Sequence, residues 1–220
     1  MSRAEQSLAV RSLGDIAASL PGSTAIFRRH KLDFCCGGSE SLEKAARRKG
    51  LDPASIEAEL ARLSPEQDSI PDSVEDLVGY IVERYHQVHR QEMPELRKLA
   101  IRVERVHADH PAAPAGLADL LARMQAELES HMEKEEQVLF PLMLAGGNPM
   151  IVHPIGMMRH EHEEHGEQLK ALAALTGDMT PPDGACNSWR ALYAGLAKLA
   201  EDLTEHIHIE NNILFPRFEA

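Results

Sequence analysis

The sequence is poor in aromatic residues, cysteine and positive charge. Aromatic residues make up 4% of the 220 residues, which disfavours β-rich architectures and favours helices packed through Leu, Ala and Met. Three cysteines, of which Cys35 and Cys36 are adjacent, cannot build the disulfide framework of a small secreted domain. The 23 Lys and Arg residues are outnumbered by 35 Asp and Glu, and this net charge of −12 argues against nucleic acid as a partner.

Long apolar runs are absent as well. No run of about 18 apolar residues occurs, so we predict no membrane-spanning segment and no membrane partner. The N-terminal region carries charges throughout and lacks the apolar stretch of a signal peptide. Together with the low cysteine content, these absences favour a reducing, cytoplasmic setting.

Turn signals divide the chain into two modules. Residues 1–64 are rich in Gly and Pro turns, which predicts several short helices. Residues 65–72 are polar and contain proline, as expected for a linker. In residues 73–220 turns are sparse, and we predict an all-α fold in which a four-helix bundle follows the small helical module. The four long helices are expected at about 73–106, 115–143, 154–175 and 184–212.

Histidine is abundant, with 12 copies against three Tyr and one Trp. Each predicted long helix has one apolar stripe at steps of three and four, as in the seam of a bundle. His or Glu interrupts this stripe in all four helices, and buried groups of this kind are costly unless they share a partner. The interrupting residues are His86, His89, His131, Glu135, His162, His165, His206 and Glu210.

An internal repeat relates these positions. The segment HMEKEEQVLFP at 131–141 aligns without gaps with HIHIENNILFP at 206–216. His and Glu four residues apart project from one helical face. Two HxxxE pairs, with a His from each of the other two helices, therefore place four imidazoles and two carboxylates in one layer. Bundles use such a set for two iron or manganese ions, whereas isolated HxxxE pairs on solvated faces would not recur on the seam.

These motifs resemble a known family. Residues 73–218 resemble a hemerythrin-like domain, and with Cys35-Cys36-Gly37-Gly38 ahead of it the chain is similar to the di-iron "repair of iron centres" proteins. The resemblance implies two non-haem iron ions, oxo- or hydroxo-bridged, and the repair of iron–sulfur clusters damaged by nitric oxide or oxidants. The implied iron ligands are His86, His131, Glu135, His162, His206 and Glu210, with the two glutamates as bridges. It also implies carboxylates near the entry to the site, here Glu127 and Glu161.

Helical phase adds two histidines next to this layer. His89 and His165 each lie three residues after an implied ligand, so we predict that they orient a ligand or capture iron that leaves the site. The alternative for each is a core histidine bonded to a backbone carbonyl or to a neighbouring Glu. His160 is rotated by about 200° from His162 and is expected to face outward. The same rotation excludes His208 relative to His206.

Cys35 and Cys36 have two interpretations. Adjacent cysteines close only a strained disulfide ring, so the structural alternative is two small residues at a Gly-Gly turn. The functional alternative is a redox-active or iron-handling thiol pair. In that case we expect the preceding basic run, residues 28–31, to lower a thiol pKa.

Two functions follow from the resemblance. The first is cluster repair on damaged iron–sulfur proteins, either by iron donation or by binding and reducing nitric oxide. The alternative is a nitric oxide or oxygen scavenger or sensor without repair activity. The ending HxxxE at 206–210 differs from the HxxxxD of oxygen-carrying hemerythrins and argues against reversible oxygen carriage. Oligomeric state, clients, electron donor and whether the chain is an enzyme stay open at this level.

Overall fold

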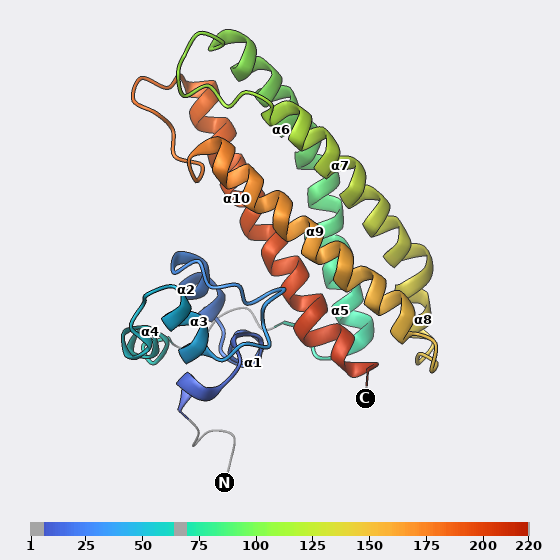
Figure 1. Ribbon diagram of the computed structural model, residues 1–220. Coiled ribbons are helices and arrows are strands. Elements are labelled where there is room, and N and C mark those ends of the chain that lie inside the picture. Colours follow the sequence, from blue (N-terminus) through green and yellow to red (C-terminus); the bar gives the residue numbers. More distant parts are fainter. Residues whose placement is uncertain (1–6, 64–69, 220) are drawn as a thin grey trace. The chain divides into compact units, whose positions relative to one another are not determined.

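The computed structural model describes residues 7–63 and 70–219 (Figure 1). Within these ranges the regular structure is helical, with no β-strand, as predicted. The chain forms two compact units, Ser73–Thr204 and a second unit made of Met1–Asp72 with Glu205–Ala220. Residues 65–69 of the expected linker lie outside the described residues. No described helix combines the length and apolar character needed to cross a bilayer.

The unit Ser73–Thr204 is built from long helices that lie side by side (Figure 1). Ser73 caps the first of them, because its side chain accepts a hydrogen bond from the N–H of Asp76 at 3.0 Å. The four predicted long segments are all helical, with ends close to those expected. Their helices are α5 Val74–Ile81, α6 Gln87–Val106, α7 Leu117–Lys134, α8 Phe140–Leu144, α9 Val152–Thr176 and α10 Asn187–Ile209, which continues into the second unit.

Three π-helical turns interrupt these segments, where the sequence predicted uninterrupted α-helix. They are η3 Val82–His86, η4 Glu135–Leu139 and η5 Glu210–Leu214. The N–H of Phe140 donates to the carbonyl of Glu135, five residues back, which is the π pattern. Each turn begins or ends at an implied iron ligand, and π turns are found mostly at functional sites.

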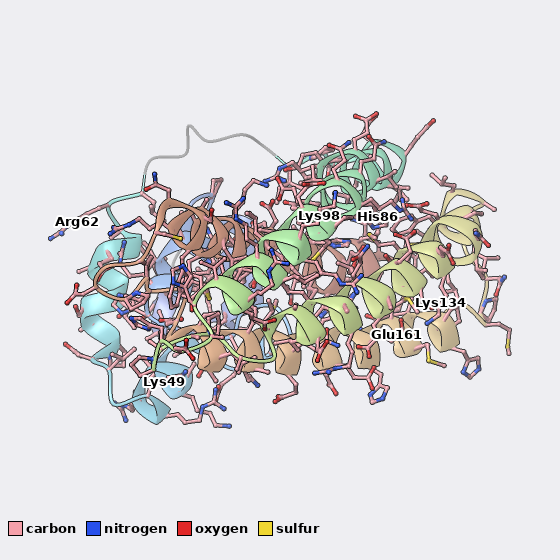
Figure 2. The ribbon with its side chains drawn as sticks, turned by 90° about the horizontal axis from the view of Figure 1, so that it is seen from above. Lys49, Arg62, His86, Lys98, Lys134 and Glu161 are labelled. Atoms are coloured by element: carbon pink, nitrogen blue, oxygen red, sulfur yellow. The ribbon has the colours of Figure 1, made fainter. Side chains whose placement is uncertain are left out.

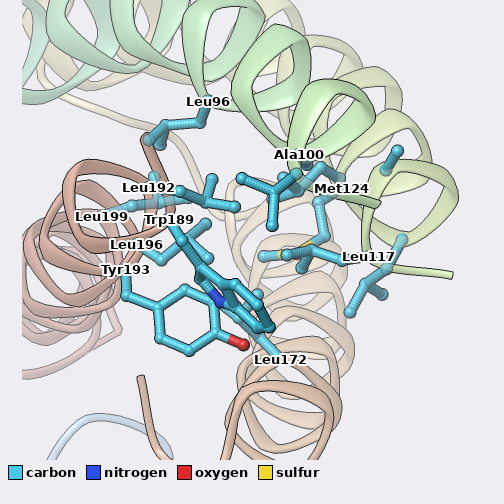
Figure 3. Close-up of a cluster of buried hydrophobic side chains, with 14 of the residues drawn as sticks. Leu96, Ala100, Leu117, Met124, Leu172, Trp189, Leu192, Tyr193, Leu196 and Leu199 are labelled. Atoms are coloured by element: carbon cyan, nitrogen blue, oxygen red, sulfur yellow. The ribbon is translucent and has the colours of Figure 1, made fainter. Parts of the chain in front are cut away.

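An apolar cluster fills one end of the long-helix unit (Figure 3). Trp189 and Leu196 of α10 pack there with Leu172 of α9, and all three are at most 1% exposed. Ala100 of α6 and Met124 of α7 belong to the same cluster. Because these positions lie about two to four turns from His86, His131 and His162 along their helices, the polar layer does not interrupt the apolar one.

Among its described residues, the second unit contains five short helices and the C-terminal turns of the chain. Phe27 and Phe34 are fully buried in its core, with ring centroids 5.8 Å apart. The side chains of Ser12, Ser41 and Asp52 cap three of the helices. The elements are η2 Leu8–Val10, α1 Leu13–Ser19, α2 Ser23–Arg29, α3 Leu42–Arg48, α4 Pro53–Leu60, η5 and η6 Phe215–Arg217.

His208 is buried by residues of the small module. Its rotation from His206 excluded it from the ligand face, yet the side chain is fully buried. Within this unit its ring lies edge-on to Phe34 at 5.3 Å, and its Nδ1 lies 3.0 Å from Nδ2 of Asn212. Burial lowers the pKa of His208 to about 4, so the imidazole is neutral at physiological pH. A seam pattern identifies only one buried face of a helix, and His208 lies on a second one.

Candidate metal centre

Four of the six implied ligands lie in the unit Ser73–Thr204. His86 ends η3, His131 lies in the last turns of α7, Glu135 begins η4 and His162 is on α9. All four side chains are at most 1% exposed. The donor atoms of His131, Glu135 and His162 lie within 4.8 Å of one another, and so do those of His86 and Glu135. The structure therefore brings the implied ligands of this unit together around Glu135.

Glu135 lies between two imidazoles. Its Oε1 is 3.4 Å from Nε2 of His131, and its Oε2 is 3.4 Å from Nε2 of His86. These distances are long for hydrogen bonds. Two ligands about 2.1 Å from one ion are separated by about 3.0 to 3.4 Å, depending on the angle between them. Each oxygen thus has the spacing expected between two ligands of one ion, relative to the imidazole that it faces.

The pair His131 and His162 has the same character. Their Nε2 atoms lie 3.1 Å apart, and both rings are buried. Two neutral imidazoles that turn ring nitrogens toward each other are common around a metal ion, because it takes a lone pair from each. This spacing also lies within the range for two ligands of one ion.

The remaining pair lies in the second unit. Nε2 of His206 is 3.0 Å from Oε1 of Glu210, and both residues are fully buried. His206 is near the end of α10, and Glu210 begins η5. The first pair has the same arrangement, with its His near the end of an α-helix and its Glu at the start of a π turn. The repeat found in the sequence is therefore also a repeat of local structure.

Glu161 fixes the orientation of one ligand histidine. Its Oε2 lies 2.9 Å from Nδ1 of His131, and its Oε1 accepts a hydrogen bond from Nζ of Lys134 at 2.6 Å. Figure 2 shows Lys134 and Glu161 next to each other, at the end of α7 and on α9. Hydrogen bonds from His131 and Lys134 lower the pKa of Glu161 to about 2, although partial burial opposes the charge. An ionised carboxylate on Nδ1 directs Nε2 of the ring toward the centre.

Glu136 has the corresponding role for His86. Its Oε1 lies 2.7 Å from Nδ1 of His86 and accepts a hydrogen bond from Arg90 at 2.7 Å. Burial raises the pKa of Glu136, but the hydrogen bonds from Arg90 and His86 outweigh it, so the pKa lies below its usual value. The sequence did not predict this role for Glu136. In a regular α-helix the residue after Glu135 points in another direction, and the π turn was not foreseen.

Phe140 explains part of the repeated LFP motif. Its ring stacks on that of His86, with centroids 5.8 Å apart and an angle of 21° between the planes. Phe140 is buried and begins α8, directly after the π turn. The motif thus supplies an apolar wall to the centre as well as a proline that follows the turn.

The two predicted neighbours of the site are both buried. The ring of His165 is edge-on to that of His131 at 5.2 Å, and its Nδ1 lies 3.2 Å from Oε1 of Gln168. Gln168 in turn donates a hydrogen bond to Glu127, which is exposed. His89 lines a small cavity of about 80 Å³ and is 1% exposed. His160 is exposed, as its phase predicted.

The thiol prediction was wrong in one respect. The pKa of Cys35 is raised well above its usual value, first by a hydrogen bond with the Cys36 thiol, then by burial and by the negative charge of Asp33. The basic run does not act on it as expected, because its cations have other partners. Arg28 pairs with Glu205 at 2.9 Å, and Arg29 and His30 both pair with Glu59.

Comparison with known proteins agrees with this geometry. Residues 78–218 match the model of the hemerythrin HHE cation-binding domain, and residues 9–64 match a domain of unknown function (DUF542, ScdA_N). A protein of Musicola paradisiaca named iron-sulfur cluster repair protein YtfE is 48% identical over 211 residues, which cover 94% of this chain and 95% of that protein. The chain belongs to this family of repair proteins. Family members of the same name from Dickeya chrysanthemi and Yersinia pseudotuberculosis are 46% and 47% identical, over 94% of this chain and 96% of theirs.

Membership of the repair family assigns a cation to the bundle. The hemerythrin HHE match spans every implied ligand from His86 to Glu210, and a hemerythrin-like domain implies non-haem iron. The donor set agrees, since it consists of imidazoles and carboxylates with no thiolate among them. The family's N-terminal domain, in contrast, contains Cys35 and Cys36.

Proposed function

We propose that the chain is a non-haem di-iron protein that repairs damaged iron–sulfur clusters. The observation that carries the proposal is the position of Glu135, with one oxygen facing His131 and the other facing His86. A carboxylate whose two oxygens face imidazoles from different helices is suited to bind two ions. Repair as the purpose is supported by the printed name of relatives that match nearly the whole chain.

The proposal assigns His206 and Glu210 to the same centre. They repeat the first pair in sequence and in local structure. Leu196, Leu199 and Leu203 of α10 are at most 1% exposed, and His206 and Glu210 continue their spacing of three and four residues. Two carboxylates and four imidazoles would give each iron ion three or more protein donors and leave a position for a small ligand.

Iron held by these residues would supply redox chemistry and a binding position for nitric oxide or oxygen. The residues of the chain set the conditions for it. Glu161 and Glu136 orient ligand histidines, and the buried carboxylate of Glu135 offsets positive charge. Burial of Glu135 and of the imidazoles that it faces keeps bulk water away from their donor atoms. Two points support the cytoplasm as the place of action. The three cysteines are free thiols, and the proposed clients are iron–sulfur proteins.

Two measurements on the purified chain test this function. The first is iron content with the visible spectrum, for which we expect two iron ions per chain and charge-transfer bands of a bridged pair. The second is reactivation of an iron–sulfur enzyme that nitric oxide has inactivated, which the iron-loaded chain should restore and the metal-free chain should not. Consumption of nitric oxide without reactivation would favour the scavenger instead, and zinc in place of iron would overturn both.

A further inference from the structure

A second group of metal-binding side chains lies in the loop after α2. The donor atoms of Asp33, Cys35 and Cys36 are all within 4.8 Å of one another. The two Sγ atoms are 3.7 Å apart, and Sγ of Cys35 is 3.4 Å from Oδ1 of Asp33. The cysteines are thiols and form no disulfide. All three residues belong to the unit that contains Met1–Asp72.

These separations agree with those of ligands around one tetrahedral ion. Two thiolates at about 2.3 Å from such an ion lie about 3.8 Å apart, and a thiolate and a carboxylate oxygen lie about 3.6 Å apart. The observed distances of 3.7 and 3.4 Å differ from these by at most about 0.2 Å. A disulfide needs about 2.05 Å and a strained ring between adjacent residues. The spacings are thus compatible with a shared ion, and the two sulfurs are too far apart for a disulfide.

Hydrogen bonds to the backbone of Cys35 and Cys36 hold the loop in place. The N–H of Cys36 donates to Oδ1 of Asp33 at 3.0 Å, which fixes the carboxylate next to the sulfur of Cys35. Asn211 and Asn212 donate to the carbonyl of Cys35 at 3.1 and 3.4 Å. These two anchors act on the backbone of Cys35 and hold the loop from outside.

The glycines of the motif have a steric reason. A Cβ at Gly38 would lie 2.6 Å from the carbonyl oxygen of Phe34, and one at Gly37 would lie 3.1 Å from that of Asp33. The chain therefore folds back on itself too closely for a side chain at Gly38. Cys-Cys-Gly-Gly is thus the sequence of a tight loop that presents two sulfurs on one side.

We propose that Asp33, Cys35 and Cys36 form a second metal site, which binds one Fe²⁺ through two thiolates and a carboxylate. Three protein donors leave the fourth position open, for water or for a ligand from a client protein. Binding transfers no electron, and the thiols release their protons to solvent as the two Fe–S bonds form. The choice of iron among divalent ions rests on the proposed function of the bundle, whereas the site itself rests on its own geometry.

Cobalt is a suitable probe for this site. Co²⁺ gives intense near-ultraviolet bands only when thiolates are ligands, and the centre in the bundle contains none. We expect one equivalent of Co²⁺ to develop these bands in the full-length chain under anaerobic conditions. Excess Fe²⁺ should displace the cobalt, the excess being needed because Fe²⁺ binds such sites more weakly. A chain without thiolate bands would overturn the site, and bands that excess Fe²⁺ leaves unchanged would overturn its assignment to iron.

Variants separate this site from the other thiol and from the bundle. Cys35→Ser and Cys36→Ser should each weaken Co²⁺ binding at least tenfold, and Asp33→Asn, which retains the hydrogen bond to Cys36, should weaken it severalfold. Cys186→Ser is the matched control and should change nothing. All four variants should keep the iron spectrum of the bundle, which serves as the check on folding. Full thiolate bands in Cys35→Ser and Cys36→Ser, or their loss in Cys186→Ser, would refute the proposal.

A bundle variant makes the two proposals independent. Glu135→Gln should lose iron from the bundle and keep the thiolate bands of Co²⁺, because Glu135 is not among the loop donors. If that variant also loses the bands, the loop is not a separate site. If it keeps both the bands and the bundle iron, the assignment of the bundle ligands fails and the loop site stands.

Discussion

Glu135→Gln is the substitution that tests the bundle centre most directly. The change keeps the size of the side chain and removes the charge that faces two imidazoles at 3.4 Å each. Loss of an outer partner alone lowers metal affinity by about 10- to 100-fold. Glu135 would be a direct ligand of both ions, so we expect at least about 100-fold weaker binding, or about 2.8 kcal/mol.

The same number applies to the stability of the iron-loaded protein. Iron binds the folded state, so weaker binding lowers the free energy of unfolding by about the same 2.8 kcal/mol. For a chain of this size, about 2 to 4 °C of melting temperature correspond to each kcal/mol. The iron-loaded variant should therefore melt roughly 6 to 11 °C below the iron-loaded wild type.

The assay measures two quantities before and after addition of a chelator. They are the iron content per chain after desalting and the melting temperature. Glu133→Gln is the control, because Glu133 lies two residues away in α7 and is exposed. It should retain both the iron and the chelator-sensitive rise in melting temperature. If Glu135→Gln also retains two iron ions and the full rise, Glu135 does not bridge the metals and the reasoning from its two contacts is wrong.

Three further predictions concern the surroundings of the centre. Glu161→Gln should speed iron loss to a chelator about tenfold, because a ligand imidazole loses its anionic partner, and the exposed control Glu164→Gln should not. His165→Ala should keep two iron ions but shift their spectrum or speed their loss, whereas the exposed His160→Ala should do neither; the reverse result would show that the phase of α9 was misassigned. Asp202 is buried and paired with two cations at 2.7 and 2.8 Å, which lower its pKa despite burial. Its stabilising effect is therefore complete above the unfolded pKa of about 3.9 and is lost as pH falls through the lower folded value. Asp202→Asn should cost about 1 to 3 kcal/mol in urea unfolding at pH 7 and flatten the acid limb, and an unchanged limb would contradict this.

The long helices could be predicted because their seam repeats over many turns. Leu192, Leu196, Leu199 and Leu203 keep a spacing of three and four, and burial of all four confirms the face they define. The imidazole and carboxylate positions were visible for the same reason, as polar breaks in an apolar stripe. Their approach in the long-helix unit, around Glu135, follows from that seam.

Other features depend on contacts that periodicity does not encode. The π turns change the helical phase by one residue at Glu135, which is why the contact between Glu136 and His86 was missed. The raised pKa of Cys35 depends on which partners the nearby arginines choose, and Glu205 and Glu59 are distant in sequence. Burial of His208 likewise depends on Phe34, far away along the chain.

The two halves of the internal duplication differ in their contacts at one matched position, 136 and 211. Directly after the first glutamate, Glu136 holds an imidazole of the centre; its counterpart Asn211 holds the backbone of Cys35. If position 211 carried a glutamate, as position 136 does, its carboxylate would have no N–H to donate to the carbonyl of Cys35. The first half therefore cannot replace the second. A chimaera made of two first halves would keep its helices and its polar seam, yet its thiol loop would lose an anchor. At this position one half of the duplication thus contacts an imidazole of the candidate centre, and the other half supports the thiol loop.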